Sequence, residues 1–330
     1  MDVLEPGGAP DRLFVLNFVR EQENRPLPWP ANAAARIEWA WKKYCRMMEW
    51  LERVPEDNVP FLDTYTGTEI FAEALGAPVH RFDFDMPCAR PLIRSATDVG
   101  KVKVPEIGSS SLATLFDMAD ALRARAGNGA LLRLPDIQSP MDIAATMWDK
   151  TDFYMAIALE LEAVQELASK IATLLCAFLD EWFERYGKGF VGHCPDCYMP
   201  SGVTFSEDEV GVVSPGMFET LFLPELVALH KRYGPLGMHC CANARHQWDG
   251  FRKIPGLRLL NLVQPPQIVR EAYTFFDRDF VHAHSWFGDG PPETWLEQLP
   301  RDARVVFTAN VNSEQEAQQM AEKLWNVCGR

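Results

Sequence analysis

The spacing of hydrophobic residues alternates between two periods in the second half of the chain. Short apolar runs are followed there by amphipathic segments whose apolar residues recur with a period of about 3.6 residues. Alternation of strands and helices at this spacing is typical of right-handed crossover connections and of a parallel sheet. The expected strands and helices alternate in the order 236–241, 247–254, 257–263, 266–275, 279–284, 292–299, 304–308 and 313–327.

The first half of the chain is more helical, and its expected strands are brief. A long apolar segment at 152–186 predicts a helix that is kinked or split, and Pro224 is expected to kink a helix at 215–232. The remaining expected elements are helices at 31–51, 66–75, 109–126 and 141–148 and strands at 58–64, 79–84, 131–134 and 203–206. Roughly eight strand–helix units fit in the chain, and this number favours a closed (β/α)₈ barrel, the TIM barrel of α/β proteins.

The N-terminal segment differs in composition from the rest of the chain. Residues 1–30 are rich in proline, glycine and charge and are expected to be irregular, and the helix at 31–51 is interpreted as an arm packed outside the main fold. The expected organisation is therefore a helical arm at 1–55 and one barrel domain at 56–330.

Composition narrows the range of partners. The chain has 330 residues, 47% of them hydrophobic, a net charge of −14 and a pI of about 5.0. Such acidity disfavours nucleic acids and anionic membranes, which are bound through lysine and arginine. No apolar run approaches the ~20 residues of a membrane span, and the start lacks the features of a signal peptide. The eight scattered cysteines indicate reduced thiols. We expect a cytoplasmic protein whose partner is a small molecule or another protein.

One strand end carries a pair of metal-binding residue types. Because side chains alternate along a strand, His239 and Cys241 point the same way at the end of 236–241. An imidazole and a thiolate can bind one soft cation, and the active site of a barrel enzyme lies at the strand ends. The alternative is a buried cysteine beside a hydrogen-bonded histidine.

Other strand ends add candidates for catalysis and substrate binding. His282 and His284 form a second pair on one face, and Trp286 follows them as a possible wall of a pocket. Glu207 and Asp208 follow the strand at 203–206, where a carboxylate can bind or protonate a substrate. Asn310 ends the last strand. The alternatives are hydrogen-bonded histidines in the barrel lining and a solvated acidic turn.

The loop before the strand at 203–206 contains a Cys-x-x-Cys pair, Cys194 and Cys197. Such a pair can bind zinc, although a structural zinc site needs a second pair. As a redox pair it would open a helix, whereas Pro195 and the following residues favour a loop. Two free cysteines in an ordered loop are the alternative.

The order of these motifs resembles the uroporphyrinogen decarboxylase superfamily. The segment 205–218, Phe-Ser-Glu-Asp-Glu-Val-Gly-Val-Val-Ser-Pro-Gly-Met-Phe, resembles its strand that ends in an acid and leads into a Ser-Pro helix. The segment 238–243, Met-His-Cys-Cys-Ala-Asn, resembles its His-x-Cys-Gly strand end, and 69–76 resembles its early helix. The resemblance covers about residues 55–325.

The resemblance implies a (β/α)₈ barrel and one of two chemistries. One branch of the superfamily decarboxylates a tetrapyrrole without a cofactor, using an N-terminal Arg-Gln-Ala-Gly-Arg motif that this chain lacks. The other branch transfers methyl groups between a corrinoid protein and a thiol, using zinc bound by His-x-Cys and a later cysteine. His239 and Cys241 match that pair, but 308–310 is Thr-Ala-Asn, and Cys328 lies a full helix further on.

Three hypotheses follow. The leading one is a zinc-dependent methyltransferase or demethylase that acts with a methylcorrinoid carried by a partner protein or with a thiol acceptor. His239 and Cys241 would bind zinc, with Cys194, Cys197 or His284 as the third ligand, and Asp208 or Glu207 would orient the substrate. The second is a metal-free decarboxylase or lyase for a small carboxylate, with His239 or His284 as proton donor. The third is a non-catalytic barrel that serves as a binding module.

Overall fold

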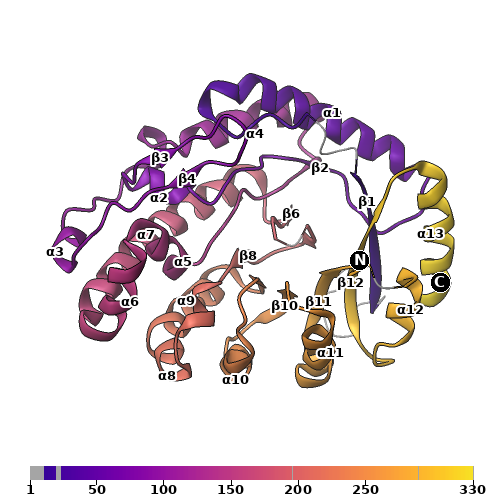
Figure 1. The fold of residues 1–330 in the computed structure, drawn as a ribbon. Helices are drawn as coiled ribbons and strands as arrows, with labels where there is room; N and C mark the ends of the chain where they lie inside the picture. The colour runs from indigo at the N-terminus through magenta and orange to yellow at the C-terminus, as the bar shows by residue number, and fades with distance from the viewer. Residues whose placement is uncertain (1–10, 20–23, 195, 289, 330) are drawn as a thin grey trace.

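The computed structural model describes residues 11–19, 24–194, 196–288 and 290–329 and shows a (β/α)₈ barrel, as the sequence predicts. The strands of the barrel wall form the inner layer and helices the outer layer, and the separate pair β3 and β4 lies beside α2 in the outer layer (Figure 1). The strands are β1 Arg12–Phe18, β2 Phe61–Leu62, β3 Val79–His80, β4 Cys88–Ala89, β5 Leu131–Leu132, β6 Phe190–Val191, β7 Tyr198–Met199, β8 Val203–Ser206, β9 Leu236–Cys240, β10 Leu257–Leu262, β11 Val281–Ser285 and β12 Arg304–Val311.

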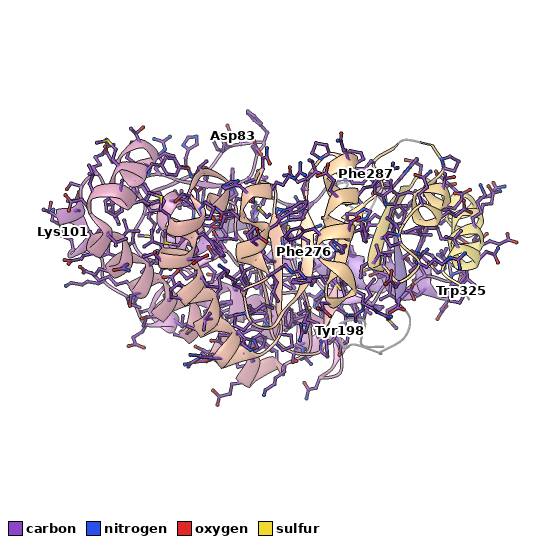
Figure 2. The ribbon with its side chains drawn as sticks, turned by 90° about the horizontal axis from the view of Figure 1, so that it is seen from below. Asp83, Lys101, Tyr198, Phe276, Phe287 and Trp325 are labelled. Carbon is purple, nitrogen blue, oxygen red and sulfur yellow. The ribbon has the colours of Figure 1, made fainter. Side chains whose placement is uncertain are left out.

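The helices cover the sheet from outside. They are α1 Ala33–Leu51, α2 Ile70–Ala74, α3 Ala96–Val99, α4 Ala113–Ala126, α5 Pro140–Met147, α6 Lys150–Leu159, α7 Leu161–Tyr186, α8 Pro215–Met217, α9 Leu223–Tyr233, α10 Trp248–Phe251, α11 Pro266–Phe275, α12 Pro292–Glu297 and α13 Glu314–Val327. The long helical segment splits between α6 and α7, as expected. Lys101 and Trp325 mark opposite ends of the molecule in the view from below (Figure 2). Among the described residues, no helix has the length and apolar character of a membrane span.

One parallel sheet makes most of the barrel wall, with strand order β1-β12-β11-β10-β9-β8. The wall continues through the parallel pair β2 and β5, through a bridge from Arg133 to Val191, and through a bridge from Gln138 to Ser206. Parallel pairing places the carboxyl ends of the strands at one mouth, which is where barrel enzymes keep their sites.

Strand β1 corrects one expectation, because residues 12–18 are not irregular. Their sequence, Arg-Leu-Phe-Val-Leu-Asn-Phe, pairs in parallel with β12 along its whole length, from Arg12 with Val305 to Phe18 with Val311. The apolar run of β1 is a strand signal that the surrounding proline, glycine and charge conceal. The first strand of the barrel therefore lies within the segment that we expected to be an arm, and α1 follows it as the first outer helix.

Side chains, and few backbone pairs, close the barrel between β1 and β2. The Asp57 amide donates to the Phe14 carbonyl at 3.0 Å, and the Asp57 carboxylate accepts the Phe14 amide at 2.9 Å. Glu56 accepts the Leu16 amide at 2.5 Å and the Trp50 indole at 2.7 Å. Backbone groups of β1 that lack a partner strand are thus satisfied by two carboxylates.

Candidate functional site

The carboxyl ends of the strands surround a cavity of about 430 Å³, which we call the mouth cavity. The end of β11 and the residues that follow it contribute a continuous stretch, 283–287, to its lining. The lining is Asn17, Arg133, His193, Cys194, Asp196, His239, Asn261, Leu262, Val263, Ala283, His284, Ser285, Trp286, Phe287, Val306 and Thr308.

Three residues from two neighbouring strand ends form a group that could bind a metal ion. Ligand atoms of Asp208, His239 and Cys241 all lie within 4.8 Å of one another. The register of β8 and β9 places them together, because Ser206 pairs with His239 and the next residues on each chain follow in step. The sequence predicted His239 and Cys241 on one side of a strand, but it assigned Asp208 to the substrate.

Asn261 fixes the orientation of the His239 ring. The Asn261 amide nitrogen donates to the Ala283 carbonyl at 2.6 Å, so the amide oxygen must face His239 Nδ1, at 2.5 Å. Since an amide oxygen only accepts, Nδ1 of His239 carries the hydrogen and Nε2 carries the lone pair in the neutral ring. Polar partners of this kind commonly fix the tautomer of a metal-binding histidine.

Asp208 and Cys241 already contact each other. The Asp208 carboxylate accepts the Cys241 backbone amide at 2.5 Å and the Cys241 thiol at 3.0 Å. Partial burial and this carboxylate raise the pKa of Cys241 to about 12. The thiol proton therefore occupies a position that a cation could take, and binding of a cation would release that proton.

Asp142 of α5 holds the turn that presents Asp208. Its carboxylate accepts the backbone amides of Asp208 and Glu209 at 2.9 to 3.0 Å. Glu207 is 1% exposed, and burial together with the neighbouring Asp142 raises its pKa well above the usual value. Glu207 is thus a buried acid beside Asp142, whereas Asp208 is the acid of this turn that belongs to the candidate metal group.

The two histidines of β11 contact side chains of the outer helices α11 and α12. His284 Nε2 contacts the Tyr273 hydroxyl at 2.9 Å and the Trp295 indole at 3.4 Å. The His282 ring packs on Tyr273 with centroids 4.2 Å apart. Burial lowers the pKa of His282 to about 3 and that of His284 to about 4. They share a face, as predicted, and both rings contact Tyr273 of α11. His284 also lines the mouth cavity. The assignment of His284 to catalysis and of His282 to substrate binding stays a prediction.

The two cysteines of the loop differ in position. Cys194 lines the mouth cavity, and burial together with Asp136 raises the pKa of its thiol to about 12. Cys197 is 6% exposed and its sulfur contacts the Tyr198 carbonyl at 3.7 Å. Within the described residues, neither belongs to the group formed by Asp208, His239 and Cys241. Their roles as metal ligands, and that of His284 as third ligand, are not supported by this geometry.

Trp286 and Asn310 occupy different parts of the last two strand ends. Trp286 lines the mouth cavity, and its backbone amide donates to the Thr308 carbonyl at 2.7 Å. Asn310 is exposed and pairs in register with Asn17, which lines the cavity in its place. The position of Trp286 is compatible with a substrate contact.

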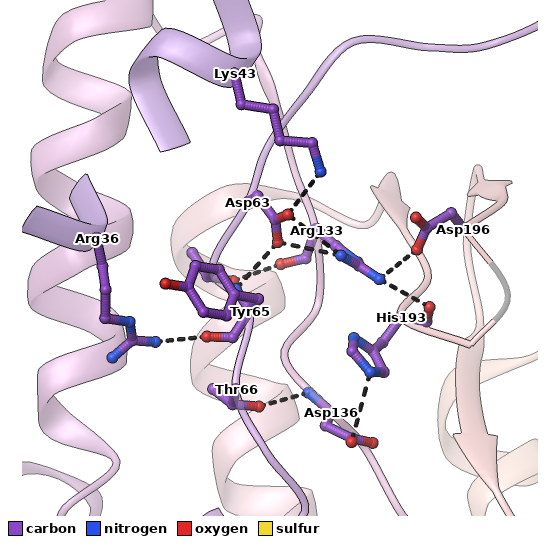
Figure 3. Close-up of polar contacts among 10 residues, drawn as sticks. Arg36, Lys43, Asp63, Tyr65, Thr66, Arg133, Asp136, His193 and Asp196 are labelled. Carbon is purple, nitrogen blue, oxygen red and sulfur yellow. Dashed lines mark hydrogen bonds and ion pairs between the residues drawn. The ribbon is translucent and has the colours of Figure 1, made fainter. Parts of the chain in front are cut away.

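Sequence reasoning missed a buried charge cluster beside the cavity, shown in Figure 3. Arg133 contacts both oxygens of Asp63 at 3.3 Å, pairs with Asp196 and donates to the His193 carbonyl at 3.0 Å. Lys43 reaches Asp63 from α1 at 2.8 Å. Burial alone would raise the pKa of Asp63, but the two cations hold it well below its usual value. The charged residues at the ends of β2 and β5 were the available signal.

His193 and Asp136 form a second pair facing the mouth. His193 Nε2 lies 3.5 Å from Asp136 Oδ2 (Figure 3). Burial and the Arg133 cation lower the pKa of His193 to about 3, and burial raises the pKa of Asp136 to about 6. Asp136 is thus an acid with a raised pKa that contacts His193, a residue in the lining of the mouth cavity.

Comparisons with known proteins agree with this fold. The family model for uroporphyrinogen decarboxylase (URO-D) matches residues 48–268, more than half of the chain. Among solved structures, a methyltransferase from Methanosarcina mazei matches with a TM-score of 0.68 at 11% identity, covering 98% of this chain and 95% of that chain. A B12-independent methionine synthase from Shewanella sp. W3-18-1, in complex with selenomethionine, matches with a TM-score of 0.50 at 12% identity over 93% and 92%. A comparison with curated proteins gives no significant match. At these identities, the likeness to solved structures establishes the fold.

Proposed function

This chain belongs to the uroporphyrinogen decarboxylase family, and from that premise we propose that it is a zinc-dependent methyltransferase with a thiol as one substrate. The observation that carries the proposal is the convergence of His239, Cys241 and Asp208 at the barrel mouth. Imidazole nitrogen, thiolate sulfur and carboxylate oxygen are the three ligand types that zinc takes in proteins.

The donor set fits a catalytic zinc site better than a structural one. A catalytic site has three protein ligands and keeps one position open for the substrate, whereas a structural site is closed by four. Asp208 takes the place of the later cysteine that the methyltransferase branch would supply near 308–310. Zinc bound here would supply a Lewis acid that lowers the pKa of a thiol and holds it as a thiolate.

The chain's own residues have separate tasks in this proposal. Asn261 presents the lone pair of His239 Nε2, and Asp142 holds the backbone of the turn that carries Asp208. Cys241 loses its proton when the site is filled. Trp286 and Phe287 wall the mouth cavity, where a thiol of small size can approach.

The methyl donor is proposed to be a methylcorrinoid carried by a partner protein. The support is indirect and consists of the methyltransferase-like strand end at 238–243 together with a site at the open mouth of the barrel. A site at this edge can be reached by a cofactor that a second protein presents.

A metal-free decarboxylase is the second candidate, and the pair of His193 and Asp136 favours it. The pKa of Asp136, raised to about 6 by burial, makes it able to donate a proton near neutral pH. In this candidate the proton donor is on the β5 side of the mouth cavity, away from His239.

Zinc content tests the proposal directly. Wild-type protein purified without chelators should contain close to one zinc per chain, and His239→Ala, Cys241→Ser and Asp208→Asn should each lose most of it. Cys194→Ser is the matched control, because Cys194 lies in the same cavity but outside the donor group, and it should retain zinc. Cobalt(II) substitution followed by thiol titration should then show a thiolate-to-cobalt absorption band.

Two results would contradict the proposal. Wild-type protein without zinc after incubation with the metal under reducing conditions would exclude this site. Zinc that is lost in Cys194→Ser but retained in Asp208→Asn would assign the third ligand to the loop.

Demethylation of free methylcobalamin in the presence of 2-mercaptoethanol, followed by absorbance, tests the methyl-transfer step separately.

A further inference from the structure

The mouth cavity contains groups that the proposed metal site does not use, and they indicate which kind of thiol fits. These groups are the charged residues of the lining and three polar side chains at the ends of β1, β11 and β12. The inference rests on the proposed function, because it takes the mouth cavity as the place where a thiol approaches the candidate metal group of Asp208, His239 and Cys241.

The charges in this lining are already paired. Arg133 and Asp196 both line the cavity, and they form an ion pair with each other (Figure 3). Arg133 also pairs with Asp63, which Lys43 contacts from α1. The cluster therefore contains two cations and two carboxylates, joined in one chain of ion pairs, so neither charge of the lining is left over for a ligand.

The other titratable side chains of the lining, outside the candidate metal group, are His193, Cys194 and His284. Burial lowers the pKa of His193 to about 3 and that of His284 to about 4, and burial raises the pKa of the Cys194 thiol to about 12. All three are therefore uncharged near neutral pH. A charged substituent of a substrate would lose hydration in this cavity without meeting an unpaired opposite charge.

Three uncharged polar side chains line the cavity on consecutive strands, and we call them the polar row. Ser285 of β11 pairs in register with Thr308 of β12, and Asn17 lies two residues beyond Val15, the β1 partner of Thr308. Within the part of the chain that the structure describes, the side chains of the polar row make no hydrogen bond. Each of them can both donate and accept one.

A buried donor next to the polar row also lacks an acceptor. Trp286 follows Ser285 in the chain and lines the same cavity, and its indole Nε1 is buried with no hydrogen-bond partner among the described residues. An indole N–H can only donate, and buried donors are normally paired. This donor and the polar row both point to a ligand that carries uncharged oxygen atoms.

The polar row lies within reach of the candidate metal group. In the sheet order, β11 is the second strand from β9. Because neighbouring strands are about 4.8 Å apart, the backbones of β9 and β11 lie about 10 Å apart. His239 and Ser285 line the cavity from these two strands, so a short carbon chain connects a sulfur at one with an oxygen at the other.

We propose that the thiol substrate is a small uncharged molecule that carries hydroxyl groups. Its sulfur is directed at the candidate metal group, and its hydroxyl groups are directed at the polar row. The cavity volume of about 430 Å³ limits the size of this molecule. A carboxylate or ammonium group on the thiol would have to compete with the existing ion pair of Arg133 and Asp196.

Titration of the cobalt(II)-loaded wild-type protein with four thiols of similar length tests the substrate class. They are 1-thioglycerol, 1-propanethiol, 3-mercaptopropionate and cysteamine, and their dissociation constants are compared for the thiolate form. We expect 1-thioglycerol to bind about fivefold more tightly than 1-propanethiol, the gain of about one hydrogen bond. It should bind at least about tenfold more tightly than either charged thiol, which would leave a charge unpaired.

The use of both an anionic and a cationic thiol separates the cavity from the charge of the whole chain. The net charge of −14 repels the anion and attracts the cation, so it cannot by itself favour the uncharged thiol over both. Tightest binding of 3-mercaptopropionate or of cysteamine would overturn the proposal, and so would equal affinities for 1-thioglycerol and 1-propanethiol. In those cases the cobalt band would still support the metal site, whereas no band with any thiol would contradict both proposals.

Two variants locate the hydroxyl groups of the ligand. Thr308→Val and Ser285→Ala each remove one hydroxyl from the polar row, and each should weaken 1-thioglycerol binding about threefold to tenfold without changing 1-propanethiol binding. Thr220→Val is the matched control, because the Thr220 hydroxyl lies outside the cavity and donates to the Gly216 carbonyl at 2.9 Å. Unchanged 1-thioglycerol binding in both cavity variants would refute the role of the polar row.

A further variant should change the charge preference. Asp196→Asn leaves an excess positive charge at Arg133, so 3-mercaptopropionate should gain at least about fivefold in affinity. Asp180→Asn is the matched control, because Asp180 also pairs with an arginine, Arg232, and also has a 42% exposed side chain, but it does not line the mouth cavity. No gain in Asp196→Asn would refute the role of the ion pair, and the wild-type titration decides the proposal if this variant does not fold.

Discussion

Asn261 shows how one amide can set the chemistry of a neighbouring ring. Its nitrogen is held by the Ala283 carbonyl, so its oxygen is left to face His239 Nδ1. Without that acceptor, the imidazole could rotate or exchange tautomers, and the lone pair of Nε2 would no longer be directed at one position. The orientation of His239 therefore depends on a residue outside the group of three candidate ligands.

Replacing this amide should weaken zinc binding. We expect Asn261→Leu to lower zinc affinity about 10-fold to 100-fold, because the ring loses the partner that fixes its tautomer. Competition with a chromophoric chelator measures the change. Asn310→Leu, at the exposed end of β12, is the control and should leave affinity unchanged. An affinity equal to wild type in Asn261→Leu would show that the hydrogen bond has no part in metal binding.

His282 makes the unfolding free energy of the protein depend on pH. Burial lowers its pKa to about 3, so below its ordinary pKa of about 6.5 the unfolded chain takes up a proton that the folded chain does not. Stability due to this residue therefore falls as pH drops from about 6.5 toward 3, by about 2 kcal/mol between pH 8 and pH 5. His282→Phe should remove that loss.

Urea unfolding of wild type and His282→Phe at pH 8 and at pH 5 measures the effect. The wild type should lose about 2 kcal/mol more unfolding free energy than the variant between the two pH values. His282→Gln, which also cannot titrate but keeps a polar group, should show the same weakened pH dependence. If His282→Gln retained the wild-type dependence, another group would be responsible.

At the scale of elements, the pairing of β8 with β9 depends on a glycine that precedes β8. Gly202 precedes β8 with φ of +94°, and a Cβ added there would lie 1.9 Å from the Pro235 carbonyl oxygen. The Val203 amide donates to the same carbonyl at 3.0 Å, so this contact starts the register of the two strands that carry Asp208 and His239.

Alanine at this position should destabilise the protein. Gly202→Ala requires both a strained backbone and a shift of Pro235, and we expect a loss of about 2–4 kcal/mol in unfolding free energy. Gly129→Ala is the matched control, because no atom lies within 4 Å of its added Cβ, and it should change stability by less than about 0.5 kcal/mol. Similar losses in both variants, measured by urea unfolding, would contradict this account.

At the scale of the whole molecule, buried ion pairs tie α1 and the loop after β6 to the sheet. Lys43 and Asp63 are 4% and 1% exposed at their side chains, and Arg133 extends the cluster to Asp196 (Figure 3). The cluster lies at the ends of β2 and β5 and reaches α1 and the loop after β6. Its members therefore hold together segments that backbone pairing alone does not join.

Removing Lys43 from the cluster should destabilise the protein. We expect Lys43→Ala to lower the unfolding free energy by about 3–5 kcal/mol, because Asp63 is left buried with one fewer cation. Lys42→Ala is the control, since the Lys42 side chain is 64% exposed and pairs with Glu38 of the same helix at 3.9 Å, and it should cost less than about 0.5 kcal/mol. Equal losses in chemical denaturation would refute a structural role for the cluster.

The sequence by itself determined the strand–helix alternation and the shared side of His239 and Cys241. Both are local properties, because the hydrophobic period and the alternation of side chains act within a few residues. The kink near Pro224 is local in the same way, and a π-helical turn at Phe218–Phe222 precedes that proline. The sequence did not predict β1, because its partner strand, β12, lies at the other end of the chain.

Only the tertiary structure decided which residues complete the candidate site. Asp208 joins His239 and Cys241 because of the register of β8 against β9, and register is a relation between strands that neither sequence segment contains. The sequence placed His282 and His284 on one face, and the structure shows both rings against Tyr273 of α11, with His284 also in the lining of the mouth cavity. Both faces of a parallel barrel strand are buried, so the pattern of apolar residues does not distinguish the lumen from the helix layer.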